Sequence, residues 1–333
     1  MPNNKFYSDL LNINNSSCEF FHINQNFNEM NIIETGPTTN YIHENIFEED
    51  LSIIINELSN LYFKELNEGK ESDIRKRHII DFIKNYKINL QEIIYWLSNN
   101  QHNSNSIHLL GYFYYYGIGV NSDKQNAYEY FKKAAELKHD AAQYNLANMY
   151  IDGDGVDKNY DKAFKLCKKL AGKGCTSGIN LLGYCYDIGI GTDIDKEKAL
   201  ELYHKTANLG NCLAQYNLAH MYKDGEGVEI DFDKTFELFK KSAEKGYSDA
   251  ISMLGYCYNN GIGTIADTQK AFELYQEAAI LDNNCAQFNL ALMYEIGEGI
   301  EKNMKQAIYW YKKSANKGNE DAQLRLEELL KDF

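Results

Sequence analysis

This chain of 333 residues is short of the features that mark several large classes of protein. It has two prolines, both within the first forty residues, so nothing later in the sequence interrupts long helices. No apolar run approaches the ~20 residues needed to cross a membrane. No positively charged start leads into an apolar stretch, as it does in a secretory signal peptide. The seven cysteines are odd in number and form no CxxC pair, which argues against a disulfide framework or a zinc site. We therefore expect a cytoplasmic protein with reduced thiols and no membrane span.

The chain also lacks the excess of basic residues that nucleic-acid binding requires. Its formal net charge is −14, and residues 1–50 hold eight acids and a single lysine. A surface of this sign repels phosphates, so no nucleic-acid partner is expected. The opening residues are rich in Asn and Ser and show no sustained period. We predict that residues 1–48 form a disordered acidic tail.

Residues 49–104 are predicted to be a helical N-terminal cap of three helices. The first helix should bury a stripe made of Ile53, Leu58, Leu61, Tyr62 and Leu66. SDIRKRHIIDFIKNY is the second helix, and INLQEIIYWLSNN is the third, with Asn89 as its N-cap. Moved forward by one repeat, this third helix aligns Tyr95 with Phe131, so we interpret it as a degenerate half-repeat.

From about residue 105 the sequence is periodic, with a step of 36 residues. Glycine recurs at 117, 153, 189, 225, 261 and 297, and another glycine follows two residues after each. An invariant Leu and a Tyr four residues later precede each glycine, as in Leu110 and Tyr114. Residues at i and i+4 share one face of a helix, and the glycine suits a helix end. A capping Asp or Asn, such as Asp123, then starts a second helix.

Six such units cannot bury their apolar faces alone, so they must stack. The residue after each invariant Leu alternates between Gly and Ala, as in Gly111 and Ala147, and lets a neighbouring helix approach closely. We predict an all-α solenoid of six 36-residue helix–turn–helix repeats over residues 105–320. Residues 321–333 begin a seventh copy and are predicted to be a C-terminal capping helix.

The unit AxAQYNLAxMYxxGxGVxxDxxKAxxxYxKAAxxG resembles the Sel1-like repeat, a relative of the tetratricopeptide repeat. The resemblance covers about residues 105–326 and implies a right-handed α/α superhelix whose first helices line a concave groove. Proteins of this family act as adaptors that assemble protein complexes. Residues 50–104 are also similar to the segment that precedes the repeats in fungal kinase-associated proteins, through phrases such as FKELNEGKE. These resemblances imply a non-enzymatic adaptor or, as the alternative, a regulatory module for a kinase or chitin-synthase partner.

Catalytic, metal-binding and cofactor-binding motifs are not expected in this chain. The paired glycines lack the third glycine of a dinucleotide-binding loop, and each pair follows a helix rather than a strand. Kinase signature motifs are missing. The eight histidines are scattered, and an ordinary surface histidine is favoured over a ligand even for His220. We expect a protein partner, no cofactor and no small-molecule substrate.

The groove offers one set of candidate binding residues. Mapping the tetratricopeptide pattern onto these repeats places two positions of each first helix, four residues apart, on the concave face. Each repeat carries an aromatic at one of the two positions, and odd and even repeats differ in which one, so successive aromatics lie one helical turn apart. This predicts a zigzag of Tyr112, Tyr144, Tyr184, Tyr216, Tyr256 and Phe288. Asn145, Asn217 and Asn289 lie beside it, and Asn148 and His220 share the face. Aromatics and amides suit an extended or helical peptide. Alternatively, the same residues belong to the repeat consensus and only join neighbouring repeats.

Overall fold

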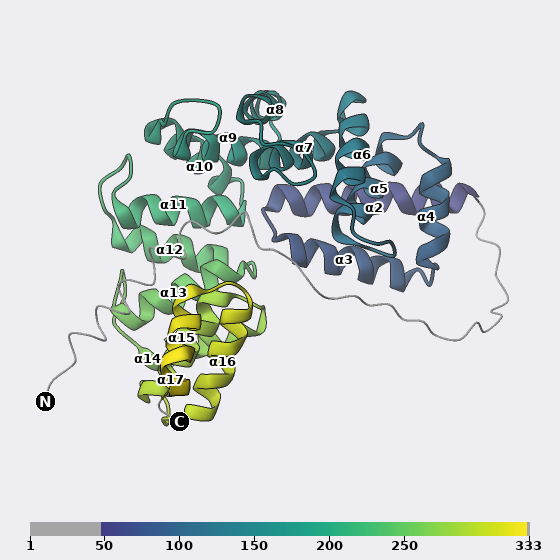
Figure 1. Ribbon diagram of the computed structural model, residues 1–333. Coiled ribbons are helices and arrows are strands. Elements are labelled where there is room, and N and C mark those ends of the chain that lie inside the picture. Colours follow the sequence, from purple (N-terminus) through teal and green to yellow (C-terminus); the bar gives the residue numbers. More distant parts are fainter. Residues whose placement is uncertain (1–47, 332–333) are drawn as a thin grey trace, which may run out of the picture. The chain divides into compact units, whose positions relative to one another are not determined.

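The computed structural model describes residues 48–331, which form sixteen helices and contain no strand (Figure 1). The predicted acidic tail, apart from its last residue, lies outside the described residues. The described chain divides into two compact units, residues 48–230 and residues 231–331. The prediction of an all-α repeat solenoid is confirmed.

The N-terminal unit contains ten helices, which begin with the predicted segment before the repeats. Their bounds are α2 (Glu48–Glu68), α3 (Ser72–Asn85), α4 (Leu90–Asn99), α5 (Ser104–Tyr116), α6 (Lys124–Glu136), α7 (Asp140–Asp152), α8 (Tyr160–Gly172), α9 (Thr176–Ile188), α10 (Lys196–Asn208) and α11 (Cys212–Asp224). Each repeat helix packs against the next one along the chain, from α5 to α11. The first helices of the repeats in this unit are therefore α5, α7, α9 and α11.

The C-terminal unit continues the same pattern with six helices. They are α12 (Phe232–Ala243), α13 (Ser248–Asn260), α14 (Thr268–Ile280), α15 (Asn284–Ile296), α16 (Met304–Asn316) and α17 (Glu320–Lys331). Sequential packing again joins each helix to the next. The first helices here are α13 and α15.

The predicted helix signals act at the predicted positions. The side chain of Asp123 accepts a 2.9 Å hydrogen bond from the N–H of Asn126 and so caps α6. Equivalent residues cap every second helix of the six repeats. Gly117 ends α5 with a φ of 65°, in the left-handed region where a side chain is unfavourable. Local chemistry thus fixes where each helix begins and ends.

From the second repeat onward, the second glycine of each pair has a different task, which is contact with the preceding repeat. A Cβ added at Gly155 would lie 2.2 Å from the carbonyl oxygen of Lys124, at the start of the preceding repeat's second helix. Added atoms at Gly191 and Gly263 would meet the carbonyls of Tyr160 and Phe232 at similar range. The first glycine of the GxG pair therefore ends a helix, and the second allows a close backbone contact with the preceding repeat.

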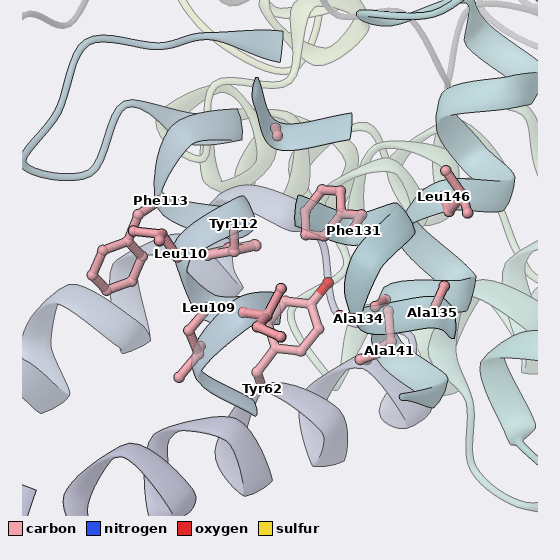
Figure 2. Close-up of a cluster of buried hydrophobic side chains, with 14 of the residues drawn as sticks. Tyr62, Leu109, Leu110, Tyr112, Phe113, Phe131, Ala134, Ala135, Ala141 and Leu146 are labelled. Atoms are coloured by element: carbon pink, nitrogen blue, oxygen red, sulfur yellow. The ribbon is translucent and has the colours of Figure 1, made fainter. Parts of the chain in front are cut away.

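The core of the N-terminal unit runs without a break from the helices before the repeats to the loop after α9. Leu110, Phe113 and Phe131 are buried at the first repeat, and Tyr62 of α2 points into the same cluster (Figure 2). The alternating small residue makes room for an aromatic ring, because a Cβ at Gly183 would lie 2.9 Å from the ring of Tyr203. The prediction that this position allows close helix packing is confirmed.

Two predictions about the segment before the repeats are wrong in register. Ile53 was expected in the buried stripe of α2 but is 59% exposed, because the helix instead buries Ile54 and Ile55 on the side that faces its neighbours. Tyr95 was aligned with the buried Phe131 but is 74% exposed. Helix α4 packs against α5 and buries Ile93 and Leu97, so it meets the repeats with a different face.

Candidate protein-binding groove

The first helices of the N-terminal unit already hold a helix of the same chain. Helix α2 contacts α5 and α9, and its C-terminal end reaches the start of α11. It buries Leu51, Ile54, Ile55, Leu58, Tyr62 and Leu66. We call the side of the first helices that carries the predicted groove residues the first-helix face. In this unit α2 covers part of that face.

Tyr62 is the centre of this contact and is 1% exposed. Its ring centroid lies 4.8 Å from that of His108 and 4.9 Å from that of Tyr112, both on α5. Its hydroxyl donates a 2.8 Å hydrogen bond to Oδ1 of Asn145 on α7. Burial raises the pKa of Tyr62, so the phenol stays protonated and remains a donor.

Asn145 also contacts a buried imidazole, that of His108. Its Nδ2 lies 3.1 Å from Nε2 of His108, and since an amide nitrogen only donates, the imidazole nitrogen accepts. His108 is therefore neutral at this position. Burial, followed by repulsion from His139, lowers the pKa of His108 well below its usual value. The His108 and His139 rings stack with centroids 4.6 Å apart.

Two asparagines of α2 bind the starts of the first helices. Nδ2 of Asn105 donates to Oδ1 of Asn56 at 2.8 Å. Eleven residues further along α2, Oδ1 of Asn67 accepts from the N–H and the hydroxyl of Ser177, at 3.1 and 3.2 Å. Nδ2 of Asn211 donates to the backbone carbonyl of Asn67 at 3.0 Å. Helix α2 is thus held by a side-chain hydrogen bond near its middle and by side-chain and backbone hydrogen bonds at its C-terminal end.

None of the eleven predicted groove residues is fully exposed. Tyr112, Tyr216 and Phe288 are buried. The others are half-buried: Tyr144, Asn145, Asn148, Tyr184, Asn217, His220, Tyr256 and Asn289. Tyr112 is inaccessible to a partner because Tyr62 of α2 packs on it. Phe288 packs on Tyr311 at 5.5 Å between ring centroids and belongs to the core of the C-terminal unit.

The half-buried members differ in what they contact. Nδ2 of Asn148 donates to the carbonyl of Tyr144 in its own helix. The ring of His220 packs edge-on against that of Tyr216, with centroids 4.6 Å apart, and its Nδ1 lies 3.9 Å from Oδ2 of Asp224. Burial raises the pKa of Tyr184 above its usual value. Of the predicted asparagines, Asn145 is the one with a described contact to α2.

Helix α2 buries a wider face than the single apolar stripe that the sequence predicted. A helix with one neighbour needs one apolar stripe, whereas α2 buries a wider face that includes Ser59 and Glu65. Glu65 is paired with Lys70 and with His78 of α3, at 3.1 and 2.6 Å. Such a buried width indicates a helix with neighbours on more than one side.

Residues 48–331 contain no group of three or more His, Cys, Asp or Glu placed to hold a metal ion. Within that range no helix combines the length and the apolar character of a membrane span. Five cysteines of the described chain are free and buried: Cys167, Cys175, Cys185, Cys212 and Cys257. Cys185 and Cys257, which stand 72 residues apart at the same position of the repeat, are both core residues.

Six consecutive segments match the Sel1 repeat family model. They are residues 104–139, 140–175, 176–211, 212–247, 248–283 and 286–319. The chain belongs to the Sel1 repeat family. Proteins built from these repeats generally mediate protein–protein interaction, and the scaffolds are typically non-catalytic.

Solved structures support the same assignment. A Sel1 repeat protein from Oxalobacter formigenes is 30% identical, with a TM-score of 0.60 over 70% of this chain and 94% of that one. A protective antigen of uropathogenic Escherichia coli with an SLR fold is also 30% identical, with a TM-score of 0.50 over 86% of this chain and 67% of that one. The comparison with curated proteins found no match.

Proposed function

We propose that this chain is a non-enzymatic, cytoplasmic scaffold that binds a peptide or domain of a partner protein along the concave face of its solenoid. The packing of α2 supports this proposal most. The first helices of this chain bind that helix through Asn145, Ser177 and Asn211. A surface that binds one helix by amides and aromatic rings has the chemistry to bind another.

The partner site that we propose lies in the C-terminal unit, on α13 and α15. In the N-terminal unit α2 packs on Tyr112 and bonds Asn145, so part of that first-helix face is already used. The equivalent residues of the C-terminal unit are Tyr256 and Asn289, both half-buried. Aromatic side chains give large contact area at low entropic cost, which suits a binding surface.

The test is affinity purification from native cell extract, read by mass spectrometry, with variants of the full chain. Tyr256→Ala with Asn289→Ala alters the proposed site, and Tyr184→Ala with Asn217→Ala is the matched control in the N-terminal unit. Circular dichroism first verifies that both variants keep their helices. We expect a partner to be lost from the C-terminal variant alone.

Retention of the same partners by both variants would place binding off this face and overturn the proposal. If a partner recovered in this way is an enzyme, such as a kinase or a chitin synthase, its rate with and without the purified chain shows whether the scaffold also regulates it.

A further inference from the structure

Two buried thiols lie in contact at the boundary between the second and third repeats. Cys167 is on α8 and Cys185 is on α9, and both side chains are shielded from solvent. The Sγ atom of Cys185 lies 3.8 Å from that of Cys167 and donates a weak hydrogen bond to it. Both cysteines are free in the structure. The sulfur atoms of a disulfide are about 2 Å apart, so a further approach of roughly 2 Å would join this pair.

The repeat pattern requires a cysteine at neither position. The position of Cys167 holds a buried aromatic residue in the other five repeats, namely Phe131, Tyr203, Phe239, Tyr275 and Tyr311. The residues that stand 18 positions after these aromatics, as Cys185 stands after Cys167, are Met149, Met221, Cys257, Met293 and Leu329. In the sequence, the second repeat is therefore the one place where both positions are small and both carry a thiol.

Cys257 shows what a single cysteine does at the same repeat position as Cys185. It is buried, and the residue that corresponds to Cys167 in its repeat is Phe239. A packing role explains Cys257, since a buried cysteine behaves as a small apolar residue. At Cys167 and Cys185 the second thiol adds what packing does not need, which is a pair of groups that can form a covalent bond.

We propose that Cys167 and Cys185 are a redox-active pair, which hydrogen peroxide converts into a disulfide that joins α8 to α9. The thiolate of one cysteine attacks an oxygen of the peroxide, the O–O bond breaks, and the sulfur becomes a sulfenic acid while hydroxide leaves. The thiolate of the other cysteine then attacks that sulfur and expels a second hydroxide. The two hydroxides take up the two protons that the thiols release. Two thiols and one peroxide thus give one disulfide and two waters, and the protein loses two electrons.

The surroundings of the pair make it slow to react. The hydrogen bond with Cys185, followed by burial, raises the pKa of the Cys167 thiol well above its usual value. Because peroxide reacts with the thiolate, brief exposure leaves the pair reduced and sustained exposure oxidises it. Hydrogen peroxide is small and uncharged, so it suits a buried site better than a bulky disulfide such as oxidised glutathione.

The disulfide acts on the first-helix face. It links the second helix of one repeat to the first helix of the next and so fixes α9 against α8. Helix α9 carries Tyr184, next to Cys185, and contacts α2. A cross-link also stabilises the folded state, because it restricts the unfolded chain. Oxidation therefore holds the part of the first-helix face that packs against α2 in a fixed position.

The test is prolonged oxidation of the folded full chain with hydrogen peroxide at pH 8. Thiols that remain are then alkylated in denaturant, and the proteolytic peptides are analysed by mass spectrometry. Cys185→Ala removes one member of the pair. Cys257→Ala is the matched control, because it removes the thiol at the same repeat position two repeats later. Circular dichroism first verifies that both variants keep their helices, and Cys167→Ala replaces Cys185→Ala if that variant does not fold.

In the wild type and in Cys257→Ala we expect a cross-linked peptide that contains Cys167 and Cys185 and is lighter than its two separate parts by two hydrogen atoms. Oxidation should raise the thermal midpoint of these two proteins by about 5 °C and leave that of Cys185→Ala without the rise. Recovery of both cysteines as alkylated thiols would overturn the inference. A disulfide that maps to other cysteines, or oxidation of either residue to a sulfinic acid instead of a cross-link, would overturn it as well.

Discussion

The hydroxyl of Tyr62 donates a 2.8 Å hydrogen bond to Oδ1 of Asn145, a residue 83 positions away in the second repeat. This bond joins the segment before the repeats to the repeats themselves. It also means that Asn145, one of the predicted groove residues, is bonded to a helix of its own chain. The stability of the N-terminal unit should therefore depend on α2.

Truncation of Tyr62 should destabilise the protein strongly. Tyr62→Ala empties a site that is 1% exposed and removes the donor to Asn145, with an expected cost of about 3–5 kcal/mol in the free energy of unfolding. Chemical denaturation measures this cost. Ile53→Ala, on the exposed side of the same helix, is the control and should change stability by less than about 1 kcal/mol. Similar costs for the two variants would show that α2 is not docked as described.

Acidification should weaken the packing of α2 through His139. The Nε2 atom of His139 lies 3.1 Å from Oδ1 of Asn105, the residue that donates to Asn56 of α2. Burial lowers the pKa of His139 from 6.5 to about 4, so the unfolded chain binds this proton first as the pH falls. The contribution of His139 to the free energy of unfolding is fully present above pH 6.5. It is lost as the pH falls through the folded-state value of about 4, and the loss amounts to roughly 3 kcal/mol. His139→Asn places the capping residue of the equivalent positions 211 and 283, which does not titrate. Denaturation at pH 7 and pH 4.5 should show a smaller acid loss in this variant than in the wild type.

Asp152 should have the opposite pH dependence. Burial, and then the neighbouring charge of Asp154, raises the pKa of Asp152 from 3.8 to about 7. A raised carboxyl pKa favours folding below pH 3.8, and this contribution is lost as the pH rises through 7. Asp152→Asn is therefore expected to stabilise the protein at pH 8 by a few kcal/mol at most. Thermal unfolding at pH 8 measures the change, with the exposed Asp157→Asn as the control. Equal effects of the two variants would contradict a raised pKa of Asp152.

Alanine at Gly155, the second glycine of a GxG pair, and at Gly174, which follows α8, should separate backbone strain from steric contact. Gly155 and Gly174 both have positive φ, 67° and 77°, but only the Cβ at Gly155 meets an atom, the carbonyl of Lys124. Gly174→Ala should cost about 1–2 kcal/mol from strain alone. Gly155→Ala should cost about 1–3 kcal/mol more because the repeats must separate. Equal midpoints in urea would show that the second glycine makes no inter-repeat contact.

Much of the fold could be predicted because its determinants are local. A helix stop such as Gly117, a cap such as Asp123 and a small residue such as Gly183 act on atoms a few residues away or in the next helix. Their 36-residue repetition then leaves stacking as the way to bury the apolar faces. Repeat length, helix bounds and fold class all follow from these short-range rules.

The candidate site was less predictable, for a physical reason. The sequence by itself determined that α2 is a helix with an apolar side and that the repeats carry Tyr112, Asn145 and their equivalents. Only the tertiary structure decided that α2 lies on the first helices and covers Tyr112. The periodicity of the sequence indicates that one face of a helix is buried. Apolar burial is not directional, so it does not determine which surface covers that face. The polar bonds of Asn56 and Asn67, which are directional, made that choice across 49 and 110 residues of sequence.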